Sequence, residues 1–163
     1  MRIIMPASIM TYRSVLLFGL LSAAACGQTS PEELTPYKAS ASVHDYMVWL
    51  LEPAADVLWD NAGYVITVEG EQDLQPTTQA GWDKVRDAAT VVAEAGNTLM
   101  MPGYAADHEA WLEYASGLTV AGVRARDAAL AKDAQALFEA GANVYSVCLA
   151  CHNRYMITEQ DTK

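Results

Sequence analysis

The chain has 163 residues, of which 52% are hydrophobic, and it carries 20 acidic against 10 basic side chains, a formal net charge of −10. This length allows one domain with a buried core and is too short for two domains of ordinary size. Nucleic acid and anionic membranes repel such an acidic chain, whereas a basic protein would attract it, although an excess of acid also simply keeps a protein soluble.

Residues 1–25 have the features of a signal peptide. Arg2 and Arg13 supply a positive start without any acid, and the apolar run VLLFGLL that follows is too short for a permanent membrane span. The small residues before Cys26 resemble a bacterial lipobox, in which the cysteine receives lipid and becomes the first mature residue. Ala23 stands where that motif usually has leucine, so ordinary cleavage after Ala25 is the alternative. In both cases cleavage removes Arg2 and Arg13, so the mature chain keeps eight basic and 20 acidic residues.

The mature chain is expected to begin with a flexible tether over residues 26–41, which are rich in Gln, Thr, Ser and Pro. Apolar residues then recur at helical spacing over residues 42–61, with Ser42 as the N-cap, and Pro53 predicts a kink or a break near Trp49. Three further helices are predicted at residues 77–100, 107–132 and 133–155, capped by Thr77 or Thr78, Asp107 and Asp133 respectively.

The stretch Tyr64–Val68 contains β-branched residues but has no second strand to pair with, so we predict a long connection between the first two helices. The remaining connections are short, which forces neighbouring helices to run antiparallel. The predicted fold class is therefore all-α, an antiparallel up-down-up-down four-helix bundle over residues 42–158.

Cys148, Cys151 and His152 form a C-x-x-C-H pattern near the end of the last predicted helix. This is the pattern of c-type haem attachment, in which both thiols add to the haem vinyl groups and the histidine ligates the iron. Positions i, i+3 and i+4 share one face of a helix, so one side of this helix can hold the porphyrin edge and present an imidazole to the iron. The export signal agrees, because we expect thioether attachment to occur outside the cytoplasm.

Three other uses of these cysteines have to be weighed against haem attachment. A thioredoxin-like dithiol would need a βαβ context and would leave His152 without a role. A zinc site would need a fourth ligand, and the remaining cysteine and histidines form no second closely spaced pair. A disulfide between Cys148 and Cys151 would close only a very small loop and stabilise little.

Four predicted helices with C-x-x-C-H on the last one, close to the C-terminus, resemble the class II c-type cytochromes, the cytochrome c′ family. The resemblance covers residues 41–156 and is strongest over residues 110–155. It implies one covalently bound haem c and a first-helix residue that covers the other side of the iron, and Met47 is the position matched to that residue here. Low-spin members of the family use methionine there as a sixth ligand, whereas five-coordinate members bind small gases such as nitric oxide.

Two functions follow from this resemblance. The first is a periplasmic one-electron carrier with haem held by His152 and Met47, because a thioether opposite histidine fills the coordination sphere and raises the potential. The second is a binder or scavenger of small gases, with His152 alone on the iron and Met47 only filling the core. The sequence shows no pair of catalytic carboxylates and no nucleophile with its base, so no enzyme is expected.

The expected partners are periplasmic redox proteins. The family resemblance also allows a homodimer, and lipid on Cys26 would anchor the protein to a membrane. Around the motif, Gly141 either makes room for the porphyrin or allows close helix packing, and Arg154 either meets a haem propionate or stays in solvent. Tyr155 is expected to pack beside the haem, and Met100 is the alternative axial ligand.

Overall fold

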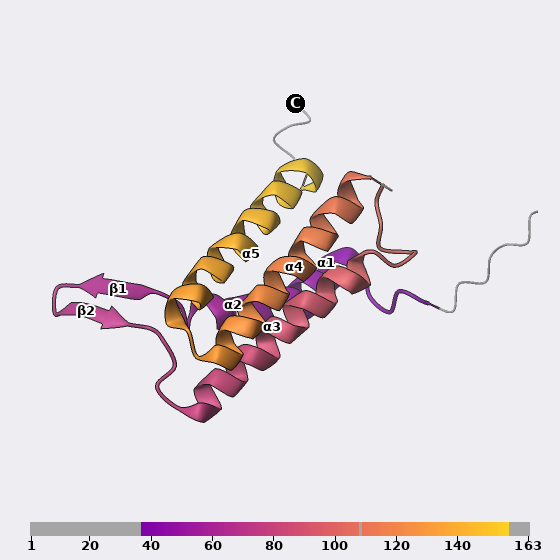
Figure 1. The fold of residues 1–163 in the computed structure, drawn as a ribbon. Coiled ribbons are helices and arrows are strands. Elements are labelled where there is room, and N and C mark those ends of the chain that lie inside the picture. The colour runs from indigo at the N-terminus through magenta and orange to yellow at the C-terminus, as the bar shows by residue number, and fades with distance from the viewer. Residues whose placement is uncertain (1–36, 108, 157–163) are drawn as a thin grey trace, which may run out of the picture. The chain divides into compact units, whose positions relative to one another are not determined.

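The computed structural model describes residues 37–107 and 109–156. The predicted signal peptide, Cys26 with its lipid, residues 26–36 of the tether, and residues 157 and 158 of the domain lie outside the described residues. Within them the protein is mostly helical, as the sequence predicts. The long helices α3 (Gln79–Leu99), α4 (Ala110–Ala131) and α5 (Ala134–Tyr155) lie side by side, and α4 runs antiparallel to the other two (Figure 1).

The first helical stretch is continuous but changes pitch in its middle. It begins with α1 (Val43–Tyr46), widens into the π-helical turn η1 (Met47–Leu51) and continues as α2 (Glu52–Trp59). The Glu52 N–H donates to the carbonyl of Met47, five residues back. Pro53 lacks an N–H, and in a regular helix its ring would press on the Trp49 carbonyl, so the wider turn replaces the predicted kink or break.

The predicted caps account for most helix starts. Ser42 Oγ accepts from the Asp45 N–H at 3.1 Å, Thr78 Oγ1 from the Gly81 N–H at 3.1 Å, and Asp133 Oδ1 from the Ala136 N–H at 3.0 Å. These bonds satisfy backbone donors that a first helical turn leaves free. At α4 the cap differs from the prediction, because the helix begins at Ala110 and its N-cap residue makes no side-chain bond.

The prediction of a structureless connection over residues 64–76 was wrong. Strands β1 (Tyr64–Thr67) and β2 (Gly70–Asp73) pair as an antiparallel hairpin that projects from the helices (Figure 1). Gly70 has a φ of 126°, which glycine adopts readily, and the Thr67 hydroxyl donates to the Glu69 carboxylate at 2.9 Å across the turn. The sequence GEQD of β2 has low strand propensity, so the pattern gave no sign of a partner for β1.

Helices α3 and α4 pack so closely that their backbones touch. A Cβ atom on Gly122 of α4 would lie 2.5 Å from the backbone nitrogen of Ala93, and one on Gly96 of α3 would lie 2.5 Å from the carbonyl oxygen of Ala115. The largest fully buried side chains come from α2, α3 and α5: Leu58, Val85, Val92, Leu137 and Val144. None of the described helices is both long and apolar enough to cross a bilayer.

Replacing Gly122 by alanine tests this contact. Gly122→Ala must push α3 and α4 apart, so we expect the free energy of unfolding to fall by about 1–3 kcal/mol, the usual cost of overpacking. Gly117→Ala is the matched control on the same helix, because its Cβ would lie 3.5 Å from Val147, an ordinary contact. The control should be neutral or gain up to about 1 kcal/mol from helix propensity. Equal effects in urea denaturation would contradict the close packing.

Candidate functional site

One apolar cavity joins the residues that the sequence singled out. Cys148, Cys151 and His152 line it from α5, and Met47 lines it from the first helical stretch. Aliphatic and aromatic side chains supply the rest of its wall: Leu51, Leu99, Trp111, Tyr114, Ala115, Leu118 and Val147. The structure therefore brings Met47 next to the three motif residues, from which it is far apart in the sequence.

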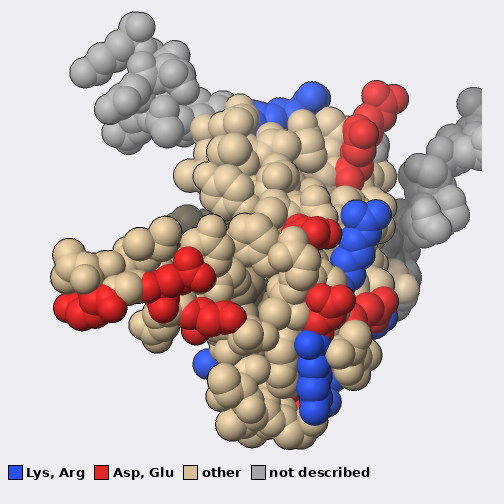
Figure 2. Space-filling view, turned by 60° about the vertical axis from the view of Figure 1, so that its left-hand side comes forward, with Lys and Arg blue, Asp and Glu red and all other residues tan. Residues whose placement is uncertain are grey.

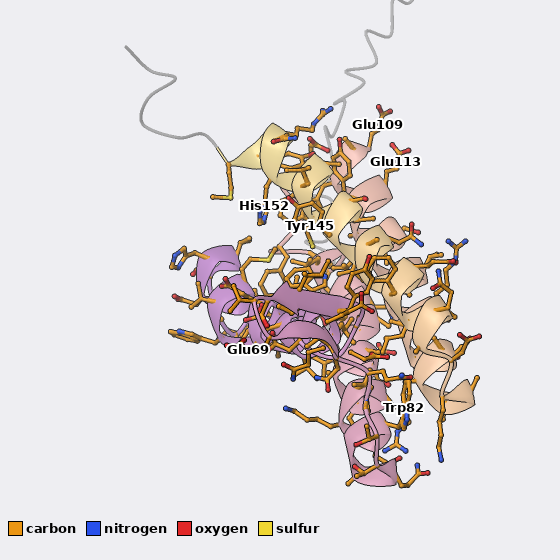
Figure 3. All side chains as sticks on the ribbon, turned by 90° about the vertical axis from the view of Figure 1, so that its left-hand side faces the viewer. Glu69, Trp82, Glu109, Glu113, Tyr145 and His152 are labelled. Carbon is orange, nitrogen blue, oxygen red and sulfur yellow. The ribbon has the colours of Figure 1, made fainter. Side chains whose placement is uncertain are left out.

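Helix α5 places the three motif residues on one side because they occupy positions i, i+3 and i+4. Figure 3 shows the imidazole of His152 pointing from α5 toward the first helical stretch. Both cysteines are partly buried free thiols. Burial raises the pKa of both thiols above the ordinary value of 9.0, and the neighbouring Cys151 raises that of Cys148 further. Both thiols are therefore protonated at neutral pH.

The burial of the two thiols does not suit a redox-active dithiol. A redox-active dithiol depends on a lowered thiol pKa, whereas here the pKa is raised, and the two cysteines lie inside a helix that packs on α4 and α2. As for zinc, in residues 37–107 and 109–156 no three His, Cys, Asp or Glu side chains come together as metal ligands. The donor groups that line the cavity are two thiols, one imidazole and one thioether, and they are not placed as ligands of a single ion.

Met47 reaches the cavity from the π-helical turn, of which it is the first residue. Such turns are frequent at functional sites, since one extra residue re-aims the side chains around it. The sequence singled out Met47 but not the turn, although Pro53 was a signal for it. Met100, the alternative axial ligand, packs partly buried against the core and does not line this cavity.

The donor set fits a covalently attached haem, and the apolar wall fits a porphyrin face. The interior of the cavity has a volume of about 30 Å³, which is room for about two water molecules. Its volume is about 380 Å³ when the mouth that opens to solvent is included. A porphyrin is larger than this interior, so it would also occupy the mouth of the cavity, and the first helical stretch would have to move away from α5. The first stretch packs mainly on α3, and Trp59 at its other end bonds to the Gly141 carbonyl of α5.

The last turn of α5, just after His152, is tied to the connection between α3 and α4. The Tyr155 hydroxyl donates to Asp107 Oδ2 at 2.6 Å, and Asp107 Oδ1 accepts from the Trp111 N–H at 3.1 Å. Arg154 lies 3.7 Å from the same carboxylate. We call Asp107, Trp111, Arg154 and Tyr155 the clasp. Sequence reasoning missed it, because it treated Asp107 only as a helix cap.

The clasp revises two expectations. Tyr155 does not line the cavity but packs edge-on against Trp111, with ring centroids 5.1 Å apart, and Trp111 lines the cavity itself. Arg154 lies over the Tyr155 ring at 5.6 Å and beside Asp107. The Gly141 carbonyl accepts from Trp59 Nε1 at 3.1 Å, and a Cβ on Gly141 would make only an ordinary contact, 3.5 Å, with the same indole.

Comparison with protein-family models, with curated proteins and with solved structures gave no match to this chain. The function proposed below therefore depends on the residues themselves and on the way the fold brings them together.

The clasp predicts a specific acid dependence of stability. The pKa of Asp107 lies below its ordinary value of 3.8, chiefly because the Tyr155 hydroxyl and then the Trp111 N–H bond to the carboxylate. A carboxylate with a lowered pKa stabilises the folded state above that ordinary value, and the contribution is lost as the pH falls through the folded pKa. Tyr155→Phe should therefore lower Tm at neutral pH and raise the pKa of Asp107.

The measurements are thermal unfolding from neutral to acid pH and NMR titration of the Asp107 carboxyl carbon. The difference in Tm between wild type and Tyr155→Phe should shrink in acid. Tyr114→Phe is the matched control, because Tyr114 meets Tyr155 through the rings, with centroids 6.2 Å apart. An Asp107 titration that is the same in both variants and in wild type would show that the clasp has no energetic role.

Proposed function

We propose that the protein is a c-type haem protein in which Cys148 and Cys151 form thioether links and His152 ligates the iron. The observation that carries this proposal is the single apolar cavity lined by the C-x-x-C-H motif and by Met47. The export signal in the sequence supports it, because it would take the chain to the compartment where such links form. We propose further that the helices form the up-down-up-down bundle of the cytochrome c′ family, with residues 43–59 as its first helix.

In this proposal the protein carries single electrons between periplasmic redox partners, and the haem, when bound, supplies the Fe(III)/Fe(II) couple. His152 and Met47 would hold the iron. Leu51, Leu99 and Leu118 line the site with apolar groups, which would favour the reduced, less charged state of a bound haem. Cys26 is the proposed site of a lipid that would hold the carrier at a membrane surface.

The second candidate is a binder of small uncharged gases such as nitric oxide. It is favoured by the apolar wall beside His152 and Met47, which suits an uncharged ligand. In this alternative Met47 lines the pocket without ligating the iron. The two candidates therefore differ in one testable bond, the bond between the Met47 sulfur and the iron.

Haem attachment is tested by producing the protein in a bacterial periplasm that contains the haem attachment machinery. We expect a coloured protein whose mass includes one haem that survives denaturation. Cys148→Ser and Cys151→Ser should each remove one link, and the double variant should release the haem to organic solvent. Cys26→Ser is the matched control and should keep the haem, while its mass shows whether Cys26 carried lipid. A colourless wild type, or haem retained by the double variant, would refute the proposal.

The sixth ligand is tested by substituting Met47. If Met47 ligates, carbon monoxide leaves the spectrum of the reduced wild type unchanged at first, and Met47→Ala turns a six-coordinate spectrum into a five-coordinate one that responds at once. The reduction potential should fall as the thioether is lost. Met100→Ala, a partly buried methionine away from the cavity, is the control and should leave the spectrum unchanged. An immediate response of the wild type would favour the gas binder instead.

A further inference from the structure

The hairpin formed by β1 and β2 exposes large apolar side chains without burying any of its residues. Ile66 is 73% exposed, Val68 99% and Tyr64 59%, and every strand residue faces solvent. A two-stranded hairpin in water is marginally stable on its own, and a cluster of exposed apolar side chains usually marks a contact surface. The exposed apolar side chains of the hairpin therefore indicate a contact surface.

The register of the hairpin shows which backbone groups face outward. The Leu74 N–H donates to the Gly63 carbonyl at 2.9 Å, so Gly63 and Leu74 form a hydrogen-bonded pair next to the sheet. Such pairs alternate along an antiparallel ladder, so Val65 and Thr67 bond to β2. Tyr64 and Ile66 then direct their N–H and carbonyl groups away from β2, along the outer edge of β1.

The same register gives one face of the hairpin a mixed chemistry. Tyr64 lies opposite Asp73, and Ile66 lies opposite Glu71, so two apolar side chains and two carboxylates share a face. With Glu69 in the turn, residues 64–73 carry three acids and no lysine or arginine. Figure 2 shows carboxylates gathered along this projecting arm.

We propose that the outer edge of β1 binds an extended basic segment of a partner protein, which adds a third strand to the sheet. Backbone groups of the segment would bond to Tyr64 and Ile66. Its lysine or arginine side chains would lie over these two residues, with their charged ends at Glu71 and Asp73. The negative charge of the hairpin favours a basic partner. A second copy of this chain would bring three more acids to the same edge, and an anionic membrane would be repelled.

This surface lies apart from the cavity. Met47 is near the start of the first helical stretch, whereas the hairpin follows the end of that stretch at Trp59 (Figure 1). A partner held at β1 would therefore leave the mouth of the cavity open. The proposal does not depend on haem and can be tested with or without it.

The probe is a labelled synthetic peptide of alternating lysine and valine, added to the protein at low and at high salt. We expect binding that weakens with salt, and protection of the Tyr64 and Ile66 amides from hydrogen exchange. Peptides of alternating glutamate and valine, or of lysines followed by valines, should bind much more weakly. Ile66→Pro removes the outward N–H, which an edge strand tolerates, and should weaken binding about three- to tenfold.

Ile66→Thr keeps that N–H and is the matched control, while Glu71→Gln with Asp73→Asn removes two of the three charges and should weaken the salt dependence. Circular dichroism of each variant checks that the helices remain folded. The proposal is overturned if the alternating basic peptide does not bind, or if Ile66→Pro binds it as well as Ile66→Thr does. Self-association that Ile66→Pro abolishes would overturn it as well, because the edge would then serve a second copy.

Discussion

The close contact between α3 and α4 is the constraint on which the rest of the structure depends. At Gly96 and Gly122 the two backbones touch, so the separation of these helices is fixed by main-chain atoms. Flexible side chains could not define that separation as sharply. Trp111 of α4 adds to the same frame by donating from its indole to the Leu99 carbonyl at 2.7 Å. The frame forms one wall of the cavity, and α5 and the first helical stretch form the other.

The two sides of the cavity are held by different contacts. On α5, the clasp anchors the turn that follows His152 to Asp107, and Trp111 takes part in the clasp and in the cavity wall. On the first stretch, Met47 stands at a turn of altered pitch that packs mainly on α3. The two sides thus hold their donors on separate helical elements, which is how a fold can place two ligands on opposite faces of a flat group.

Helical periodicity and capping chemistry predicted the parts of the fold that depend on local sequence. The stripes of apolar residues and the caps at Ser42, Thr78 and Asp133 located the helices to within a few residues. The spacing of Cys148, Cys151 and His152 required only a helix to put them on one face. The meeting of Met47 with these residues was expected from a family resemblance and not from periodicity.

The features that were missed depend on partners that local sequence does not reveal. The strand β2 has no apolar alternation, because neither face of the hairpin is buried, and so its sequence gave no sign of a strand. Asp107 and Tyr155 lie 48 residues apart, so no local pattern could join them. The π-helical turn accommodates Pro53, which has no N–H to donate. A kink or a break in the helix would accommodate the proline equally well, so the sequence alone could not decide among the three.

The altered pitch of the first stretch has one more consequence. A π-helical turn contains one residue more than a regular turn, so the residues before it are rotated by about 100° relative to those after it, compared with a straight α-helix. Removing a single residue from the segment 48–51 would rewind this turn and bring a different side chain in place of Met47 against the cavity. The length of this segment, as well as its composition, therefore decides which atom faces His152.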